Sequence, residues 1–208
     1  MSALRPDLAI IAGWIRPGSR ILDLGCGEGD LLAYLRAQHG VSGYGVEIDE
    51  ARVVAAIRHG VPVIQQDLDG GLRNFGDQSV DTVVLSLTLQ ASKFPLDLLL
   101  EMLRVGREVI VTFPNMGHWH ARWQLAVQGR MPVTDALPHA WYDTPNIHLC
   151  TIRDFESLCR ENGVAVHQRV VLNDQRRQTW LNRLLPNLFG EVALYRCARV
   201  AASPLREE

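Results

Sequence analysis

The chain has 208 residues, 47% of them hydrophobic, and a formal net charge of −2 at pH 7. This length suits a single large domain over residues 1–208, and the weak negative charge argues against a nucleic-acid partner, which would need a concentrated basic surface. Four scattered cysteines without a Cys-x-x-Cys pair, no secretion signal and no apolar run long enough to span a bilayer predict a cytoplasmic protein that engages no membrane.

The first part of the chain alternates between helix-like and strand-like patterns. Residues 7–15 predict a short amphipathic helix. Strands are then expected at about 21–24, 43–49, 62–66, 80–85 and 107–113. Helices are expected between them at roughly 27–38, 49–58 and 95–104. This alternation is typical of a mostly parallel sheet that is covered by helices on both faces.

The final third departs from this simple alternation. Thr151 and Asp154 form a capping-box pattern that starts a helix ending near Gly163. Two further strands, at about 164–172 and 191–200, complete the predicted sheet.

A glycine-rich segment separates the first strand from the helix that follows it. Gly25, Gly27 and Gly29 have the spacing G-x-G-x-G. A strand, a glycine loop and a helix in this order bring backbone amides against a nucleotide-like ligand. A dinucleotide fingerprint would carry its third glycine one residue later, where this chain has Asp30. Because Asp30 and Glu28 would oppose a bound diphosphate, we expect a ligand with little or no phosphate.

Acidic residues stand at the ends of the next strands. Glu47 follows the glycine loop by about 20 residues, where folds of this kind place a carboxylate on ribose hydroxyls. Asp67 ends the third strand and can accept a hydrogen bond from an exocyclic amine such as that of adenine. Asp49 is most simply a helix N-cap. Asp23 either contacts the ligand or only braces the loop, and Cys26 is a small residue suited to a tight turn.

Taken together, residues 23–29 (DLGCGEG), Glu47 and residues 66–68 (QDL) resemble the S-adenosylmethionine-binding motifs of class I methyltransferases. The resemblance implies a Rossmann-like α/β fold with helices on both faces of a mostly parallel seven-stranded sheet, whose last strand is antiparallel. It implies S-adenosyl-L-methionine, or S-adenosyl-L-homocysteine, as the cofactor.

The resemblance also assigns roles to individual residues. It implies that Gly25 and Gly27 turn the backbone beneath the methionine part, that Glu47 holds the ribose, and that Asp67 with the Leu68 amide holds the adenine. Ser86, at the exit of the fourth strand, would lie near the sulfonium. The complete expected set for cofactor binding is Asp23, Gly25, Cys26, Gly27, Glu47, Ile48, Asp67, Leu68 and Ser86.

Residues 114–150 form an insert that is rich in tryptophan and histidine. Loops with such residues on a rigid scaffold often carry function. The insert could be a lid over the ligand or a substrate, or a protein-docking surface, since Trp and Tyr are favoured interface anchors. A metal site would use His118, His120, His139 or His148, but the His-x-His pair would point to different sides of a helix, so we expect no metal.

The same region carries a second resemblance. Residues 113–119 (FPNMGHW), 129–132 (GRMP) and 141–148 (WYDTPNIH) resemble the methionine biosynthesis MetW family, and with the glycine loop the match runs from about residue 6 to residue 200. The resemblance implies a methyltransferase-fold protein that is linked to homoserine O-acyltransferase, MetX, as a partner that supports the acylation of homoserine.

The chain offers no clear catalytic set. His118, His139 and Tyr142 are candidate general bases, but no pattern ties one of them to a substrate, and the nucleophile motif G-x-S-x-G is absent. Our leading hypothesis is therefore a cofactor-binding, sensor-like partner of the acyltransferase. The alternatives are a small-molecule methyltransferase with residues 114–150 as its substrate lid, and a fold relative that has lost the ligand. Whether the chain forms a homodimer stays open.

Overall fold

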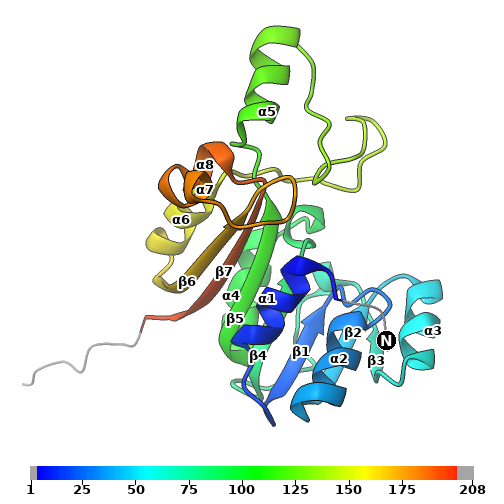
Figure 1. Ribbon diagram of the computed structural model, residues 1–208. Coiled ribbons are helices and arrows are strands. Elements are labelled where there is room, and N and C mark those ends of the chain that lie inside the picture. The colour runs from blue at the N-terminus through cyan, green and yellow to red at the C-terminus, as the bar shows by residue number, and fades with distance from the viewer. Residues whose placement is uncertain (1–3, 201–208) are drawn as a thin grey trace, which may run out of the picture.

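The computed structural model describes residues 4–200, in which seven strands form one sheet in the order β3-β2-β1-β4-β5-β7-β6. β1 to β5 pair as parallel neighbours, whereas β7 runs antiparallel between β5 and β6. The predicted seven-stranded, mostly parallel sheet with an antiparallel last strand is confirmed (Figure 1). The strands are β1 (Arg20–Leu24), β2 (Ser42–Glu47), β3 (Val63–Gln65), β4 (Val80–Ser86), β5 (Gly106–Pro114), β6 (Val164–Leu172) and β7 (Val192–Arg199).

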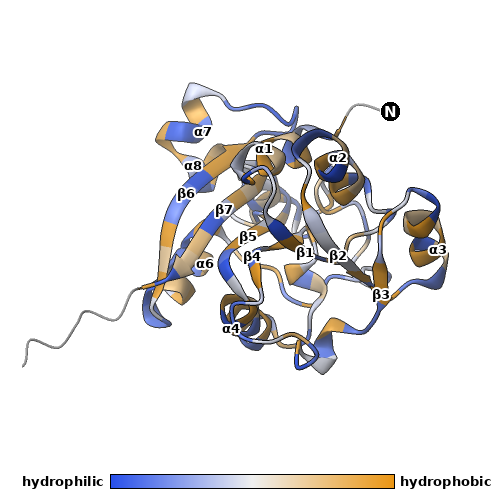
Figure 2. Cartoon of the chain, turned by 90° about the horizontal axis from the view of Figure 1, so that it is seen from below, coloured by the Kyte–Doolittle hydropathy of each residue, from blue (hydrophilic) through white to orange (hydrophobic). Residues whose placement is uncertain are grey.

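Helices cover both faces of the sheet, as the alternation predicts. The longer ones are α1 (Pro6–Trp14), α2 (Asp30–His39), α3 (Glu50–Arg58), α4 (Pro95–Val105) and α6 (Ile152–Glu161). α1 and α2 lie on one face, and α4 and α6 on the other (Figures 1 and 2). Short helical segments complete the chain: η1 (Leu68–Gly70), η2 (Leu89–Ala91), α5 (Trp119–Trp123), the π-helical turn η3 (Gln124–Gln128), α7 (Trp180–Leu184) and α8 (Pro186–Phe189).

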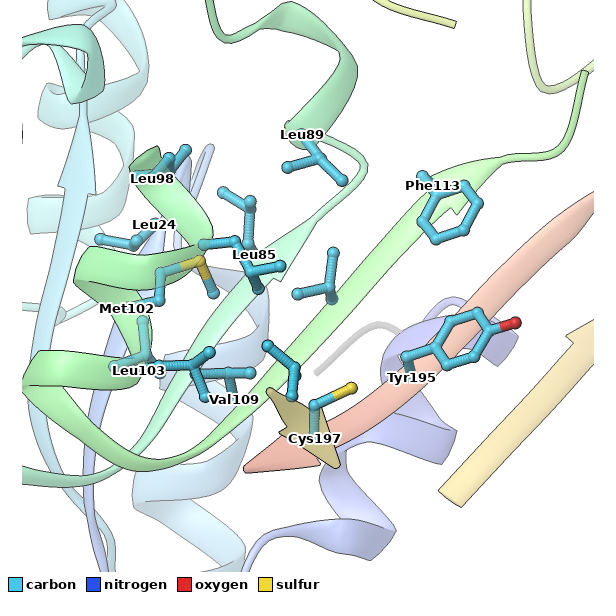
Figure 3. Close-up of a cluster of buried hydrophobic side chains, with 14 of the residues drawn as sticks. Leu24, Leu85, Leu89, Leu98, Met102, Leu103, Val109, Phe113, Tyr195 and Cys197 are labelled. Carbon is cyan, nitrogen blue, oxygen red and sulfur yellow. The ribbon is translucent and has the colours of Figure 1, made fainter. Parts of the chain in front are cut away.

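The strands are apolar on both faces, which is why both faces need helices. Ile21 of β1 packs into the cluster beneath α1 and α2, while Leu22 and Leu24 pack into the cluster beneath α4 and α6. Figure 3 shows the second cluster, in which Met102 of α4 lies among strand residues. Each such fully buried side chain stabilises the fold by roughly 1.5–3 kcal/mol, so the sheet is a rigid platform.

Local sequence signals set several helix ends. The side chain of Asp49 accepts a hydrogen bond of 2.9 Å from the Arg52 amide, as the predicted N-cap requires. The capping box of Thr151 and Asp154 is also present. The helix predicted from residue 27 instead begins at Asp30. Its predicted first turn is a loop, because Gly27 and Gly29 adopt φ values of 58° and 83°, outside the right-handed helical region.

The insert leaves the carboxyl end of β5 and projects away from the sheet (Figure 1). We call residues 116–149 the arm. Its two ends lie together, because Asn115 and Cys150 form an isolated β-bridge and the Met116 amide donates to the Cys150 carbonyl over 3.0 Å. None of the helices within residues 4–200 combines the length and apolarity that crossing a bilayer would require.

Candidate functional site

Two adjoining pockets follow the carboxyl ends of β1, β2, β3 and β4. The first, of about 390 Å³, lies over the glycine loop and the start of α2, and the second, of about 510 Å³, lies over the ends of β2 and β3. They share four lining residues, Gly25, Arg52, Leu87 and Thr88, so they form one continuous groove. Open α/β sheets bind their ligands at this edge, and the size suits a nucleoside-sized molecule.

The glycine loop approaches the exit of β4 closely where the two pockets meet. A Cβ atom on Gly25 would lie 2.6 Å from Oγ1 of Thr88, and Gly25 has a φ of 67°. Only glycine fits both the space and this backbone conformation. Leu87, next to Thr88, also has a positive φ of 53°, which is uncommon for a branched side chain and concentrates backbone strain at the groove.

Glu47 is 5% exposed and lies at the end of β2. Its Oε2 accepts a hydrogen bond of 2.9 Å from the Gly27 amide, and its Oε1 accepts from the amides of Ile48 and Asp49 at 2.9 and 3.1 Å. A carboxylate has about four acceptor positions, so one remains at Oε2 after these three bonds. The residue expected at the ribose therefore also holds the glycine loop against β2.

Asp23 is 3% exposed and lines the first pocket. Burial, reinforced by the nearby charge of Glu47 and opposed by that of Arg5, raises the pKa of its carboxyl group from 3.8 to about 7. No group among residues 4–200 donates a hydrogen bond to this carboxyl group. Because burial disfavours the ionised carboxylate, a positively charged group in the pocket would stabilise it.

The ends of β3 and η1 form the floor of the second pocket. Oδ1 of Asp67 accepts a hydrogen bond of 2.9 Å from the Asp69 amide, which leaves Oδ2 for a ligand. Asp69 in turn accepts from the Lys93 amide over 2.9 Å and fixes η1 against the segment after β4. Leu68 lines the same pocket, half-buried.

The other predicted residues lie along the groove in different ways. Ser86 lines the first pocket, but its hydroxyl lies 3.3 Å from that of Thr112. Ile48 lines the second pocket with an exposed side chain. Cys26 also lines the first pocket, yet its sulfur packs over Gly45, and burial raises the pKa of its thiol to about 12. A thiol with so high a pKa stays protonated at neutral pH, which suits a structural place in the turn.

Several lining residues are absent from the sequence-based set. Arg5 and Arg52 place positive charge at the groove, and Thr88 narrows it. Their roles depend on how distant segments meet, and neither spacing nor a motif marked them. From the arm, Pro145 and Asn146 reach the second pocket.

The end of the arm is tied to η2. The amides of Ile147 and His148 both donate to the carbonyl of Gln90, at 2.7 and 3.0 Å. We call residues 145–148 the strap, because they hold the arm against the groove. None of the tryptophan or tyrosine residues of the arm lines the two pockets, so only the strap contributes lining residues to the groove.

The histidine side chains of the insert do not cluster into a metal-binding site. His118 occupies the N-cap position of α5 but makes no capping hydrogen bond through its side chain, and burial lowers its pKa. Across the described part of the chain, residues 4–200, no group of three or more His, Cys, Asp or Glu side chains is placed to hold a metal ion.

Comparison with known proteins gives the following matches. The family model described as "Methionine biosynthesis protein MetW" matches residues 5–197. A bifunctional methionine biosynthesis protein MetXA/MetW from Rhodopirellula baltica is 36% identical over 200 residues, which are 92% of this chain and 32% of that protein. The chain thus spans about a third of the length of this curated relative.

The fold is also found among solved structures. An S-adenosylmethionine-dependent methyltransferase from Mesorhizobium loti has a TM-score of 0.69 at 18% identity, covering 94% of this chain and 98% of that one. A second such methyltransferase, from Methanosarcina mazei, has a TM-score of 0.67 at 16% identity, covering 97% and 100%. At these identities the likeness shows the fold alone, and that fold is the methyltransferase fold expected from the sequence.

Proposed function

This chain belongs to the methionine biosynthesis protein MetW family, and from that premise we propose that it binds S-adenosylmethionine in the groove and acts as the partner of a homoserine O-acyltransferase. In this proposal the chain is a single methyltransferase-like domain. The fraction of its grooves that are occupied depends on the concentration of S-adenosylmethionine, the pathway's downstream product. The observation that supports the proposal is that all nine residues expected to bind the cofactor line the groove, whereas none of the three candidate general bases does.

The nucleoside part of the cofactor suits the second pocket. Asp67, with Oδ2 unused, and the Leu68 amide would hold the adenine amine and ring. The remaining acceptor position on Glu47 would take a ribose hydroxyl, in a charge-assisted hydrogen bond worth roughly 1.5–3 kcal/mol. Ile48, exposed beside Glu47, would provide an apolar surface for the adenine.

The amino-acid part suits the first pocket. The buried Asp23 carboxylate would accept from the ammonium group, and the guanidinium of Arg5 or Arg52 would attract the carboxylate. Gly25, Gly27 and the neighbouring Cys26 would let the loop backbone pass close beneath the ligand. The absence of a phosphate in this ligand agrees with the acidic residues Glu28 and Asp30 along the same pocket.

The bound cofactor would bring an electrophilic methyl group to the exit of β4, near Ser86. Methyl transfer to a hard nucleophile also needs a general base at that place. The three candidate bases from the sequence, His118, His139 and Tyr142, do not line either pocket of the groove. This favours a binding role over an enzymatic one.

The identity of the partner rests on the fused relative. The name of this relative joins a MetXA part and a MetW part in one polypeptide, and the present chain matches about a third of it. Two functions joined in one chain are often functions that work together in the same place. The partner we propose is therefore the separate acyltransferase of the same pathway.

The methyltransferase fold leaves one alternative, a small-molecule methyltransferase. The deciding experiment incubates the purified protein with S-adenosylmethionine and candidate acceptors, and separately with homoserine O-acyltransferase, homoserine and its acyl donor. We expect a rise in acylation and no turnover to S-adenosylhomocysteine. Turnover by the protein alone would reject the partner role in favour of the alternative. Calorimetry that shows no binding of S-adenosylmethionine would reject the cofactor assignment.

A further inference from the structure

The arm carries a large amount of apolar surface that the rest of the chain leaves uncovered. Trp119, Trp123, Met131, Trp141 and Tyr142 are all exposed, and the side chains of Trp141 and Tyr142 are 73% and 74% exposed. Large exposed apolar patches often mark interaction sites, and this arm concentrates exposed apolar side chains in one segment. In Figure 1, α5 and the loop that follows it project away from the sheet and its helices.

The composition of the arm is that of the centre of a protein interface. Its 34 residues include two arginines and two aspartates but no lysine and no glutamate. Interface centres are enriched in Trp, Tyr, Met and Arg and depleted in Lys, Glu and Asp, so the arm fits this composition except for its two aspartates. A solvated loop of this length would be expected to carry more charge.

The exposed aromatic side chains of the arm do not line the groove. Of the arm, only Pro145 and Asn146 line the second pocket, and the aromatic side chains line neither pocket. A closing lid would direct its aromatic residues toward the ligand. The arm places them elsewhere, so a macromolecule, rather than the cofactor, is the occupant that would cover them.

The arm is also held in a defined position, as a docking element must be. At its base the side chain of Asn115 accepts from the Gly117 amide at 2.9 Å and donates to the carbonyl of Gly190 at 2.7 Å. At its other end the strap is bonded to Gln90. A preorganised surface loses less conformational entropy on binding than a mobile loop.

We propose that the arm is the surface that docks on the homoserine O-acyltransferase, an inference that rests on the function proposed above. The relative in which a MetXA part and a MetW part share one chain identifies this occupant. The strap follows Trp141 and Tyr142 closely in the sequence, and its residues Pro145 and Asn146 line the second pocket. One short segment therefore connects the proposed docking surface with the cofactor groove. The apolar side chains of Trp180 and Leu184 on α7 are exposed beside α8, which contacts the base of the arm through Asn187, and they extend the surface.

The test measures binding of the full-length protein to homoserine O-acyltransferase from the same organism by calorimetry. The test variant is the double substitution Trp141→Ser and Tyr142→Ser. Trp123→Ser is a second variant on the helical leg of the arm. The matched control is Tyr44→Ser, which removes an aromatic side chain that is 51% exposed on β2, outside the arm. Circular dichroism and the affinity for S-adenosylmethionine verify that each variant is folded with an intact groove.

We expect the double variant to weaken the complex at least tenfold, Trp123→Ser to weaken it severalfold, and Tyr44→Ser to leave it unchanged. A folded double variant that binds the acyltransferase as tightly as the unaltered chain would overturn the docking surface while sparing the proposed function. An unaltered chain that does not bind the acyltransferase would overturn both. Sedimentation that shows a dimer which the double variant dissociates, without any acyltransferase complex, would assign the arm to a second copy and overturn the proposal.

Discussion

The amide of Gly27 donates a hydrogen bond of 2.9 Å to Oε2 of Glu47, although the two residues are 20 positions apart. The bond joins the loop after β1 to the end of β2. The carboxylate that we assign to the ribose therefore also shapes the loop beneath the amino-acid part of the ligand. A change at Glu47 must affect both ends of the groove.

Substitution of Glu47 tests this double role. Glu47→Gln keeps the size of the side chain but replaces one acceptor oxygen with a donor, which cannot accept from the backbone amides. We expect the affinity for S-adenosylmethionine, measured by calorimetry, to fall about tenfold or more. Glu50→Gln, on the exposed first turn of α3, is the matched control. Equal affinities of the two variants would remove Glu47 from the site.

A second prediction concerns the contact between the glycine loop and Thr88. Gly25→Ala adds a methyl group 2.6 Å from the Thr88 hydroxyl oxygen at a positive φ, and we expect a loss of about 2–4 kcal/mol in the free energy of unfolding. Gly27→Ala meets nothing within 4 Å, so only the backbone strain of about 1–2 kcal/mol remains. Denaturant unfolding measures the difference.

The clash between the new methyl group of Gly25→Ala and Thr88 can also be reduced by shortening the side chain of Thr88. Adding Thr88→Ala to Gly25→Ala removes the two nearest atoms, Oγ1 at 2.6 Å and Cγ2 at 2.9 Å, and leaves only Cβ at 3.2 Å from the new methyl group. We expect the double variant to be more stable than the sum of the two single changes predicts, since the residues couple directly. Additive effects would mean that the strain in Gly25→Ala comes from its φ alone.

Asp23 gives a pH dependence of stability. Its carboxyl group ionises near pH 3.8 in the unfolded chain and near pH 7 in the folded one. Between these values the folded chain retains a proton that the unfolded chain has lost, so this group lowers the free energy of unfolding as the pH rises from about 4 to 7. The contribution amounts to a few kcal/mol at most. In Asp23→Asn, this slope should disappear from unfolding curves measured at several pH values.

Ligand binding should respond to pH in the opposite direction. An ammonium group bound to Asp23 requires the ionised carboxylate. The affinity for S-adenosylmethionine is therefore expected to rise between pH 5.5 and 7, by up to tenfold per pH unit, below the range in which an α-amino group titrates at about 7.7–8.0. Asp23→Asn should show a flat profile. A rise of equal steepness in that variant would assign the effect to another group.

The strap should contribute to the groove and the aromatic tip should not. Asn146→Ala removes a polar side chain that lines the second pocket, and we expect the affinity for the cofactor to fall by up to about tenfold. Trp141→Ser, in the same arm but away from the groove, should leave it unchanged. The reverse order of effects would show that the aromatic residues close over the ligand after all.

Coupling between the two sites is the final prediction. If S-adenosylmethionine changes the affinity for the acyltransferase by some factor, the acyltransferase must change the affinity for S-adenosylmethionine by the same factor. We expect a factor above five in both titrations, because the strap touches both sites. Equal affinities with and without the cofactor would separate partner binding from sensing.

The sequence predicted those features that depend on neighbouring residues. The N-cap at Asp49, the capping box at Thr151 and the order of strands along the chain follow from local chemistry, and the structure confirms them. The predicted start of the helix after the glycine loop was wrong by three residues, since helix-like spacing of leucines does not reveal the positive φ values of Gly27 and Gly29.

Features that depend on distant residues could not be predicted in this way. The packing of Cys26 over Gly45 and the use of Glu47 by the Gly27 amide arise only when β1 and β2 lie side by side. Likewise, the aromatic composition of the insert predicted either a lid or a docking surface. Only the folded chain shows that Asn146 lines the groove and that Trp141 lines neither of its two pockets.

The bridge between Asn115 and Cys150 means that the chain returns from the arm to almost the place where it left. A cut by a protease between residues 119 and 144 would thus leave two fragments that stay associated through the sheet, with the groove still assembled. For the same reason, insertions and deletions in this stretch can alter which surface is presented without disturbing β5 or α6. The arm can therefore change in sequence and length while the sheet and helices beneath it stay the same.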